Sequence, residues 1–92
     1  MIAGETILAE AERLTTQDRN HTYGPFTVES QKIARGWSEI LDTDIPPDKV
    51  ALCMIWMKIV RQTNKHTRDN WTDMAGFASI GFQAAEALKE QP

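Results

Sequence analysis

Asp69 and Asp73 are the two residues whose types and spacing point most directly to chemistry. They stand one helical turn apart in a segment of mostly small and apolar residues. Side chains four residues apart on a helix lie on one face, where like charges repel each other. The pair therefore requires a positive group nearby: a basic side chain of the protein, a divalent metal, or a basic part of a ligand. Function depends on which of these is present.

Lys58 and Arg61 are the basic residues best placed to meet these acids. They are three residues apart, hence on one helical face, and they follow the apolar run of residues 50–57. We expect their head groups at the rim of the core, where they either pair with Asp69 and Asp73 or bind a phosphate. A charge-assisted hydrogen bond contributes about 1.5–3 kcal/mol, so both outcomes are physically reasonable.

The polar loop of residues 18–23 is the second candidate site, because it places many hydrogen-bonding side chains before a glycine. Arg19 could grip a phosphate with its forked guanidinium, and Tyr23 or a tryptophan could stack on a base. The alternative is a plain turn, in which Asn20 satisfies backbone amides and Tyr23 packs on the core. His21 could act as a general base, but spacing gives it no fixed partner.

Magnesium is the metal that the residue types support best, because the chain offers carboxylates but no histidines at ligand spacing. Asp69 and Asp73 would supply two ligands if the protein were an enzyme. The helix that follows residue 47 adds no acid between Val50 and Arg61. The single cysteine, Cys53, excludes an internal disulfide and is expected to be a small buried residue of an apolar run.

The bulk properties indicate one small domain spanning residues 1–92. A net charge of −3 argues against general nucleic-acid binding, which normally requires a basic stripe. The longest apolar run has eight residues, too few to span a membrane, and no signal peptide is visible, so we expect a cytosolic protein. Three tryptophans, three phenylalanines and four methionines are many for a chain that folds with a narrow margin, and they favour burial against a copy of itself.

The hydrophobic periodicity predicts an all-α chain with helices at about 5–15, 25–41, 47–62 and 69–89. The third helix is apolar nearly all round and is expected to be covered on several sides. Small residues in the fourth, among them Gly76 and Gly81, would let another helix approach closely. The expected buried stripes are Ile7, Leu8, Ala11 and Leu14, with Glu10 pointing elsewhere; Phe26, Ile33, Trp37, Ile40 and Leu41, with Ser30 and Ala34 on the same side; and Trp71, Met74, Ala75, Ala78, Phe82, Ala85 and Leu88.

The chain resembles a family of small phage and prophage proteins that has no established activity. The likeness covers about residues 7–85, almost the whole chain, and its motifs are specific. They are residues 14–20, 22–25, 33–34, 37–38, 50–52, 58–59, 61, 69–71 and 73–78.

A more distant likeness adds chemistry. The acidic helix with Asp69 and Asp73, in a four-helix chain with a tyrosine-glycine loop, is similar to the all-α nucleoside triphosphate pyrophosphohydrolases (MazG-like proteins). Those are helical dimers or tetramers that hold magnesium with an acidic pair on each of two helices. Here Asp69, Asn70 and Asp73 match only the later pair, and Lys58 and Arg61 stand where the earlier pair is expected. Since cations hold phosphates directly, the resemblance implies a nucleotide-sized pocket and favours binding over hydrolysis.

These observations predict a four-helix, MazG-like bundle, assembled as a homo-oligomer, that binds a nucleotide in the host cytoplasm without a cofactor. In a phage it could sequester a host nucleotide immune signal of the cyclic dinucleotide or ADP-ribose type. The alternatives are a magnesium-dependent pyrophosphohydrolase, with Asp69 and Asp73 as metal ligands, and a non-catalytic assembly module. The predicted ligand-binding residues are Arg19, Asn20, His21, Tyr23, Lys58, Arg61, Asp69, Asn70 and Asp73.

Overall fold

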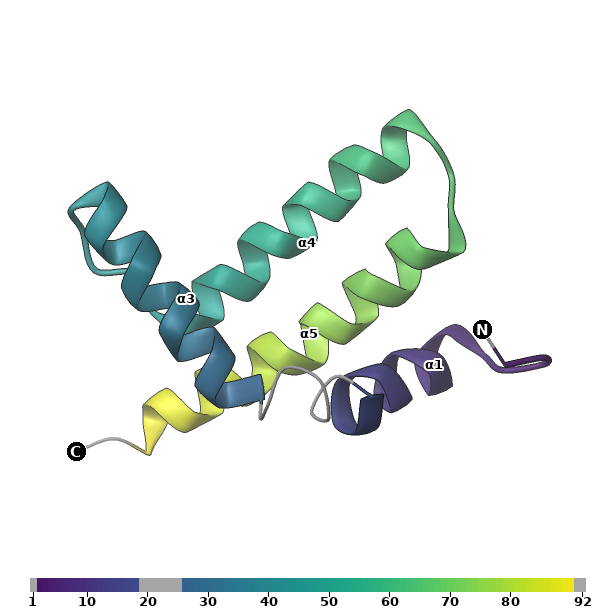
Figure 1. The fold of residues 1–92 in the computed structure, drawn as a ribbon, viewed down its shortest axis with the longest axis horizontal. Helices are drawn as coiled ribbons and strands as arrows, with labels where there is room; N and C mark the ends of the chain where they lie inside the picture. Colours follow the sequence, from purple (N-terminus) through teal and green to yellow (C-terminus); the bar gives the residue numbers. More distant parts are fainter. Residues whose placement is uncertain (1, 19–25, 91–92) are drawn as a thin grey trace.

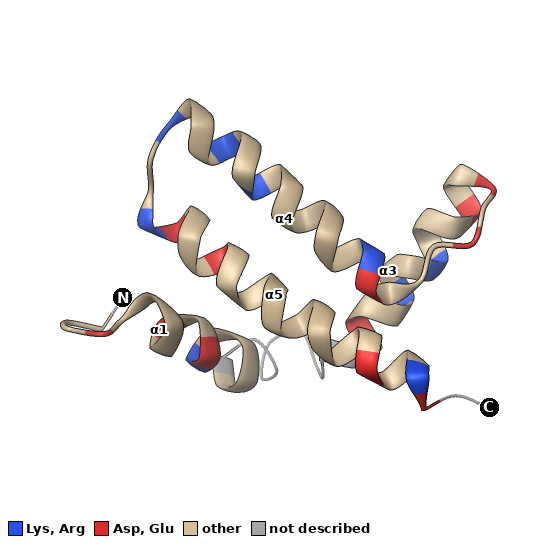
Figure 2. Cartoon of the chain, turned by 180° about the vertical axis from the view of Figure 1, so that it is seen from behind, with Lys and Arg blue, Asp and Glu red and all other residues tan. Residues whose placement is uncertain are grey.

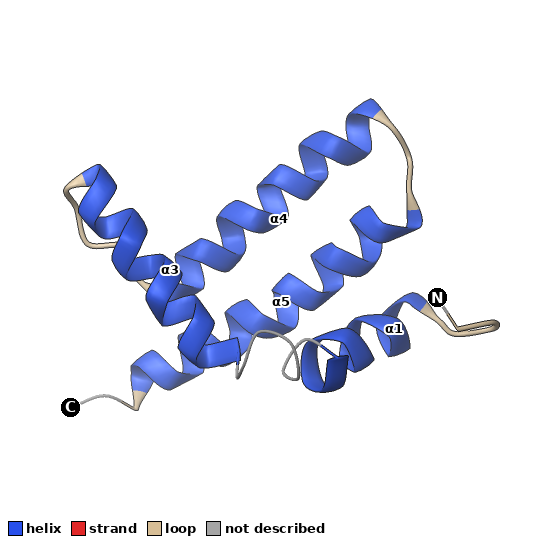
Figure 3. Cartoon of the chain, in the orientation of Figure 1, coloured by secondary structure: helices blue, strands red, loops and turns tan. Residues whose placement is uncertain are grey.

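The computed structural model describes residues 2–18 and 26–90, which form helices and short connecting loops with no strand (Figure 3). The predicted all-α class is therefore confirmed for the part of the chain that the structure describes. The helices match the predicted ones to within a few residues. They are α1 (Ile7–Arg13), continued by a π-helical turn η1 (Leu14–Asp18), α3 (Phe26–Leu41), α4 (Pro47–Asn64) and α5 (Arg68–Lys89).

Local sequence explains where these helices begin. The hydroxyl of Thr6 accepts the backbone N–H of Ala9 at 3.1 Å and caps α1. The hydroxyl of Thr67 accepts the N–H of Asn70 at 3.2 Å and caps α5. Such caps satisfy amides that the first helical turn leaves without partners. Helix α4 begins at Pro47, whose fixed φ suits a first turn, and an acidic residue follows it.

Helices α4 and α5 lie side by side and run in opposite directions, joined at one end by a short connector (Figure 1). Helix α1 packs along α5, and α3 crosses at the other end, where it contacts both α4 and α5. The arrangement is open: the Cα radius of gyration is 14.0 Å, whereas about 12 Å is typical for this length. None of the described helices is long and apolar enough to cross a membrane.

Two glycines of α5 mark where neighbouring segments approach it most closely. A Cβ added at Gly76 would lie 3.1 Å from Cγ2 of Thr15, and one added at Gly81 would lie 3.0 Å from Cβ of Ala51. Helix α5 is therefore in contact with the end of the first helical segment and with α4 through its small residues. The prediction that these small residues admit close packing is confirmed.

The predicted buried stripe of α5 is wrong for three of its members, because Trp71, Ala78 and Phe82 are exposed. Trp71 is 48 % exposed and Phe82 is 67 % exposed. Because α5 lies between α1 and α4, its small side chains occupy both contacts, and the aromatic ones are left on the open face. The buried residues of α5 are instead Asn70, Thr72, Gly76, Ile80 and Ala84.

The other helices also leave predicted core residues exposed. Leu8 in α1 and Ile40 and Leu41 in α3 are exposed, whereas Glu10, predicted to point elsewhere, is buried. Helix α4 is not covered on several sides by the described helices, because it packs mainly against α5 and α3, and Cys53, predicted to be buried, is exposed. Among the described residues, the buried hydrophobic ones are correspondingly few and small: Ala11, Ala34, Val50, Ala51, Ile80 and Ala84.

Candidate functional site

The ammonium of Lys58 lies 2.7 Å from a carboxylate oxygen of Asp73, so α4 and α5 are joined by an ion pair. Figure 2 shows the basic residues along the C-terminal half of α4 beside the acidic residues of α5. The sequence left open whether a basic side chain, a metal or a ligand supplies positive charge to the acidic pair. At Asp73, the basic side chain of Lys58 supplies it. Lys58 is only 14 % exposed, which leaves little of it accessible to a ligand.

Arg61 and Asp69, the other members of this group, are both exposed and do not pair with each other. Asp69 stands in the first turn of α5, where its charge complements the positive end of the helix dipole. Arg61 forms no ion pair with any carboxylate of the described residues, so its guanidinium is accessible to an anionic ligand.

The described residues do not fit a magnesium ion. No three His, Cys, Asp or Glu side chains among them come together as metal ligands. The carboxylate of Asp73 already has the ammonium of Lys58 at 2.7 Å, and Asp69 alone offers one exposed carboxylate. Magnesium requires several oxygen ligands in near-octahedral geometry, and this donor set does not provide them.

Asn70 ties the connector between α4 and α5 to both helices. Its side-chain nitrogen donates to Oε1 of Gln62 at 3.1 Å and to the carbonyl oxygen of Lys65 at 3.2 Å. The same oxygen of Gln62 accepts the backbone N–H of Thr67 at 3.2 Å. Asn70 is 7 % exposed, so its amide holds the connector in place. The assignment of Asn70 as a ligand-binding residue stays a prediction.

His66 continues this network to the indole of Trp71. Nε1 of Trp71 donates to Nδ1 of His66 at 3.3 Å, and Nε2 of Gln62 lies 2.8 Å from the same ring nitrogen. The indole N–H can only donate, so Nδ1 acts as an acceptor and the ring proton is on Nε2. The network fixes the indole, although almost half of its surface remains exposed.

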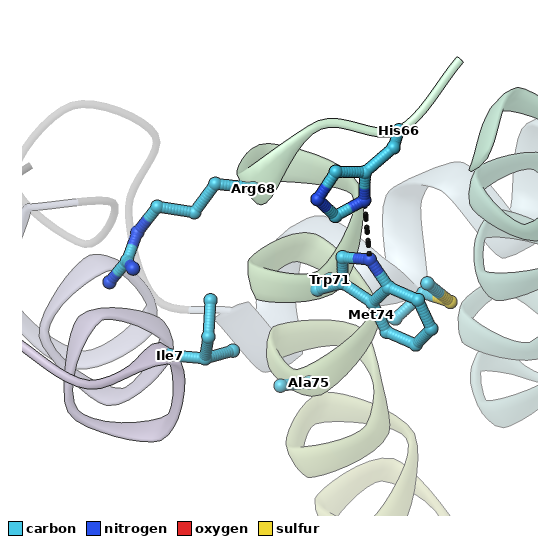
Figure 4. Close-up of a pocket in the computed structure, with 6 residues that line it drawn as sticks. All are labelled: Ile7, His66, Arg68, Trp71, Met74 and Ala75. Atoms are coloured by element: carbon cyan, nitrogen blue, oxygen red, sulfur yellow. Dashed lines mark hydrogen bonds between the residues drawn. The ribbon is translucent and has the colours of Figure 1, made fainter.

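A pocket of about 710 Å³ lies across one face of α5, from Ile7 on α1 to the indole of Trp71. Figure 4 shows Trp71 and His66 at one side of this pocket and Arg68 and Ile7 at the other. A volume of 300–1,000 Å³ with mainly apolar walls and a few polar groups is typical of small-molecule sites. We call it the Trp71 pocket. Its lining residues are Ile7, His66, Arg68, Trp71, Met74 and Ala75.

Arg68 joins the Trp71 pocket to the buried acid of α1. Its guanidinium donates to the carbonyl oxygen of Glu5 at 2.7 Å, and its Nε lies 3.4 Å from a carboxylate oxygen of Glu10. The side chain of Glu10 is only 4 % exposed, whereas that of Arg68 is 34 % exposed. Arg68 therefore neutralises a buried carboxylate while part of it remains accessible from the pocket.

Glu5 and Arg13 form a second ion pair at the base of α1. Nε and Nη2 of Arg13 each lie 3.0 Å from a carboxylate oxygen of Glu5. This hydrogen bonding holds the pKa of Glu5 below its ordinary value of 4.5. The contacts of Arg68 with Glu5 and Glu10 join α5 to α1 and so hold one wall of the Trp71 pocket, whereas the pair of Glu5 with Arg13 lies within the first helical segment.

The structure brings only some of the predicted site residues together. Lys58 and Asp73 are in direct contact; Arg61 and Asp69 are separate and exposed. None of these four lines the Trp71 pocket. The predicted loop ligands Arg19, Asn20, His21 and Tyr23 lie outside the described residues.

Sequence reasoning missed the residues that line the Trp71 pocket. We expected Trp71 and Met74 to be core residues, and the sequence assigned no role to Ile7 beyond the core. The spacing of Gln62 and His66, four residues apart, is a signal that could have suggested contact across the helix end. No sequence pattern indicates that Ile7 approaches Trp71, because α1 and α5 meet only through tertiary packing.

A second pocket, of about 910 Å³, lies between α3, the connector after it and the end of α5. It is lined by Glu39, Asp42 and Asp44, with Arg35 as its one basic residue. Three carboxylates would repel a phosphate group. Between these two pockets, the Trp71 pocket is therefore the better candidate for an anionic ligand.

Residues 6–85 match the family model described as "Domain of unknown function (DUF6378)". The chain belongs to the DUF6378 family. It is also 41% identical over 90 residues to the Gene 55 protein of Mycobacterium phage D29, an alignment that covers 96% of this chain and 56% of that protein. The resemblance to a phage protein family is thus confirmed. This DUF6378 chain spans a little over half the length of that relative, and no solved structure matches it.

Proposed function

We propose that this DUF6378 protein binds a nucleotide in the Trp71 pocket. The observation that carries the proposal is the fixed, half-exposed indole of Trp71 forming one wall of a mainly apolar pocket of about 710 Å³. Aromatic side chains accept any base by stacking, with a contribution of about 1–3 kcal/mol for each base. The planar indole would hold the base, and Arg68 provides positive charge in the same pocket.

Arg61 is the second residue that would contact phosphate. It lies near the C-terminal end of α4, next to the connector that carries His66, and no described carboxylate neutralises it. A guanidinium can form two parallel hydrogen bonds with a phosphate. The ligand-binding roles of Arg19, Asn20, His21 and Tyr23, and those of Lys58, Asp69, Asn70 and Asp73, stay predictions.

The phage relative supports a biological setting for this proposal. A phage protein that captures a nucleotide in the host cytoplasm could withhold an immune signal of the cyclic dinucleotide or ADP-ribose type. Capture requires binding without turnover, which agrees with the poor fit of the described carboxylates to magnesium. We extend the proposal to a homo-oligomeric bundle of the MazG-like kind, which the small core of the single chain supports.

Thermal shift with a nucleotide panel tests the proposal. The panel comprises ATP, ADP-ribose and a cyclic dinucleotide, each at 1 mM with and without magnesium, and released phosphate is measured in the same samples. A ligand at 100 times its dissociation constant stabilises the folded state by about 2.7 kcal/mol. We expect such a shift from one class of nucleotide, without turnover. No shift from any nucleotide would contradict the proposal, and magnesium-dependent turnover would favour the pyrophosphohydrolase.

Matched variants locate the site. Trp71→Ala should weaken binding about ten- to a hundredfold, as the loss of one stacking contact predicts. Phe82→Ala removes an exposed aromatic side chain from the same helix, outside the Trp71 pocket, and should leave affinity unchanged. Arg61→Gln should weaken binding, whereas Arg35→Gln, an equal change of charge on α3, should not. Equal nucleotide affinities in all four variants would exclude the Trp71 pocket as the nucleotide site.

A further inference from the structure

The face of α4 directed away from α5 carries an apolar stripe that no described residue covers. Leu52, Trp56, Ile59 and Val60 are 55 %, 67 %, 38 % and 52 % exposed. Their spacing of three and four residues places them on one side of the helix. We call these four residues the α4 stripe. Lys58, the charged residue between them in sequence, is turned toward α5, where it pairs with Asp73.

The described part of the chain has a small core, and the chain as a whole has a large surface for a monomer of its mass. Among the described residues, the buried hydrophobic ones are four alanines, one valine and one isoleucine. The chain exposes 6526 Å², about 1,100 Å² more than a compact monomer of its mass. A stable protein–protein interface typically buries about 800 Å² on each partner. The surplus surface is therefore of the size that one such interface removes.

We propose that the α4 stripe is the surface by which two copies of this chain associate, with α4 of one copy packed against α4 of the other. The proposal names the surface of the oligomer proposed above and does not depend on nucleotide binding. A two-fold contact uses the same patch on both copies, and the stripe suits this because Trp56 stands at its centre. In an antiparallel pair, which opposes the two helix dipoles, Leu52 faces Val60 of the partner subunit.

The charges around the stripe are compatible with this pairing. No charged side chain lies on the stripe between residues 52 and 60, so no charge is buried without a partner. Lys49, one turn before the stripe, would lie near the uncharged Thr63 of the partner subunit. Central aromatic side chains such as Trp56 commonly provide much of the binding energy of an interface.

Sedimentation equilibrium of the full chain without ligand, over 5–200 μM, tests the proposal. We expect a mass of about twice 10.4 kDa for the wild type. Trp56→Glu should raise the dimer dissociation constant at least about 30-fold, as expected for a central interface residue. Ile40→Glu, at an isoleucine of α3 that is 80 % exposed, should leave the mass unchanged. A monomeric wild type, or a folded Trp56→Glu that remains dimeric, would overturn the proposal.

A second measurement leaves the stripe intact, in case Trp56→Glu fails to fold. In a Trp37→Phe/Trp71→Phe variant, Trp56 is the remaining tryptophan and can be excited selectively. Its emission should shift to shorter wavelength and become less accessible to iodide as the protein concentration rises. If the mass doubles as the protein concentration rises but iodide quenching of Trp56 does not change, the dimer interface does not include the α4 stripe. A dimer that binds no nucleotide would contradict the proposed function alone, and a monomer that binds one would contradict this inference alone.

Discussion

Lys58 and Asp73 join the two long antiparallel helices through a contact of 2.7 Å. The sequence had left two roles open for these residues, an internal ion pair or a site for phosphate and metal. The structure gives them the first role within the described chain. The distinction has measurable consequences for stability.

Asp73→Asn is expected to destabilise the fold by about 1 kcal/mol, because the pair is only partly buried. That corresponds to a fall in Tm of about 4–8 °C for a domain of this size. A double-mutant cycle with Lys58→Met should recover most of this value as coupling energy. Asp69→Asn, at an exposed acid of the same helix, should cost less. A coupling energy of zero, with a Tm that rises on adding magnesium, would instead indicate a metal site.

Arg68→Met should cost more than any other charge removal described here, about 2–4 kcal/mol in unfolding free energy. The reason is that the carboxylate of Glu10, 4 % exposed, would lose its positive partner. Arg61→Met is the matched control and should change stability by less than about 0.5 kcal/mol, because Arg61 is exposed. Chemical denaturation at pH 7 measures both values. If the two variants lost the same unfolding free energy, Arg68 would not stabilise the fold through its contact with Glu10.

Gly81→Ala should destabilise the protein although alanine is the better helix former. The gain in helix propensity is about 1 kcal/mol, whereas overpacking costs about 1–3 kcal/mol. The new Cβ would lie 3.0 Å from Cβ of Ala51, an atom fixed by its backbone. Gly36→Ala, with nothing within 4 Å, should stabilise the protein. Thermal unfolding of the two variants should therefore give shifts of opposite sign.

The ion pair of Glu5 with Arg13 should make the stability of the first helical segment dependent on pH. The folded-state pKa of Glu5 lies below its ordinary value of 4.5 because Arg13 donates hydrogen bonds to it. The stabilisation is therefore fully present above pH 4.5 and is lost as the pH falls through the lowered pKa. The difference in Tm between wild type and Glu5→Gln should narrow from pH 7 to pH 3. A difference that stays constant across this range would show that the pair does not contribute.

The sequence by itself determined the helical class and the ends of the helices. Hydrophobic periodicity, Pro47 and the capping threonines act within one or two turns, so their effects are readable without knowing the fold. It also determined that small residues such as Gly81 permit close helix contact. Within the candidate site, it identified Lys58 and Asp73 as groups that could meet.

Only the tertiary structure decided which side of each helix is covered. Helix α5 lies between α1 and α4, so its small residues face these helices and Trp71 is left on an open face, where Arg68 and Ile7 complete a pocket. The prediction for α4 failed in the opposite way: we expected its apolar residues to be covered, but the described helices leave the α4 stripe exposed. Periodicity records which residues share a face, but the partner of that face depends on how distant segments meet, and that information is spread over the whole chain.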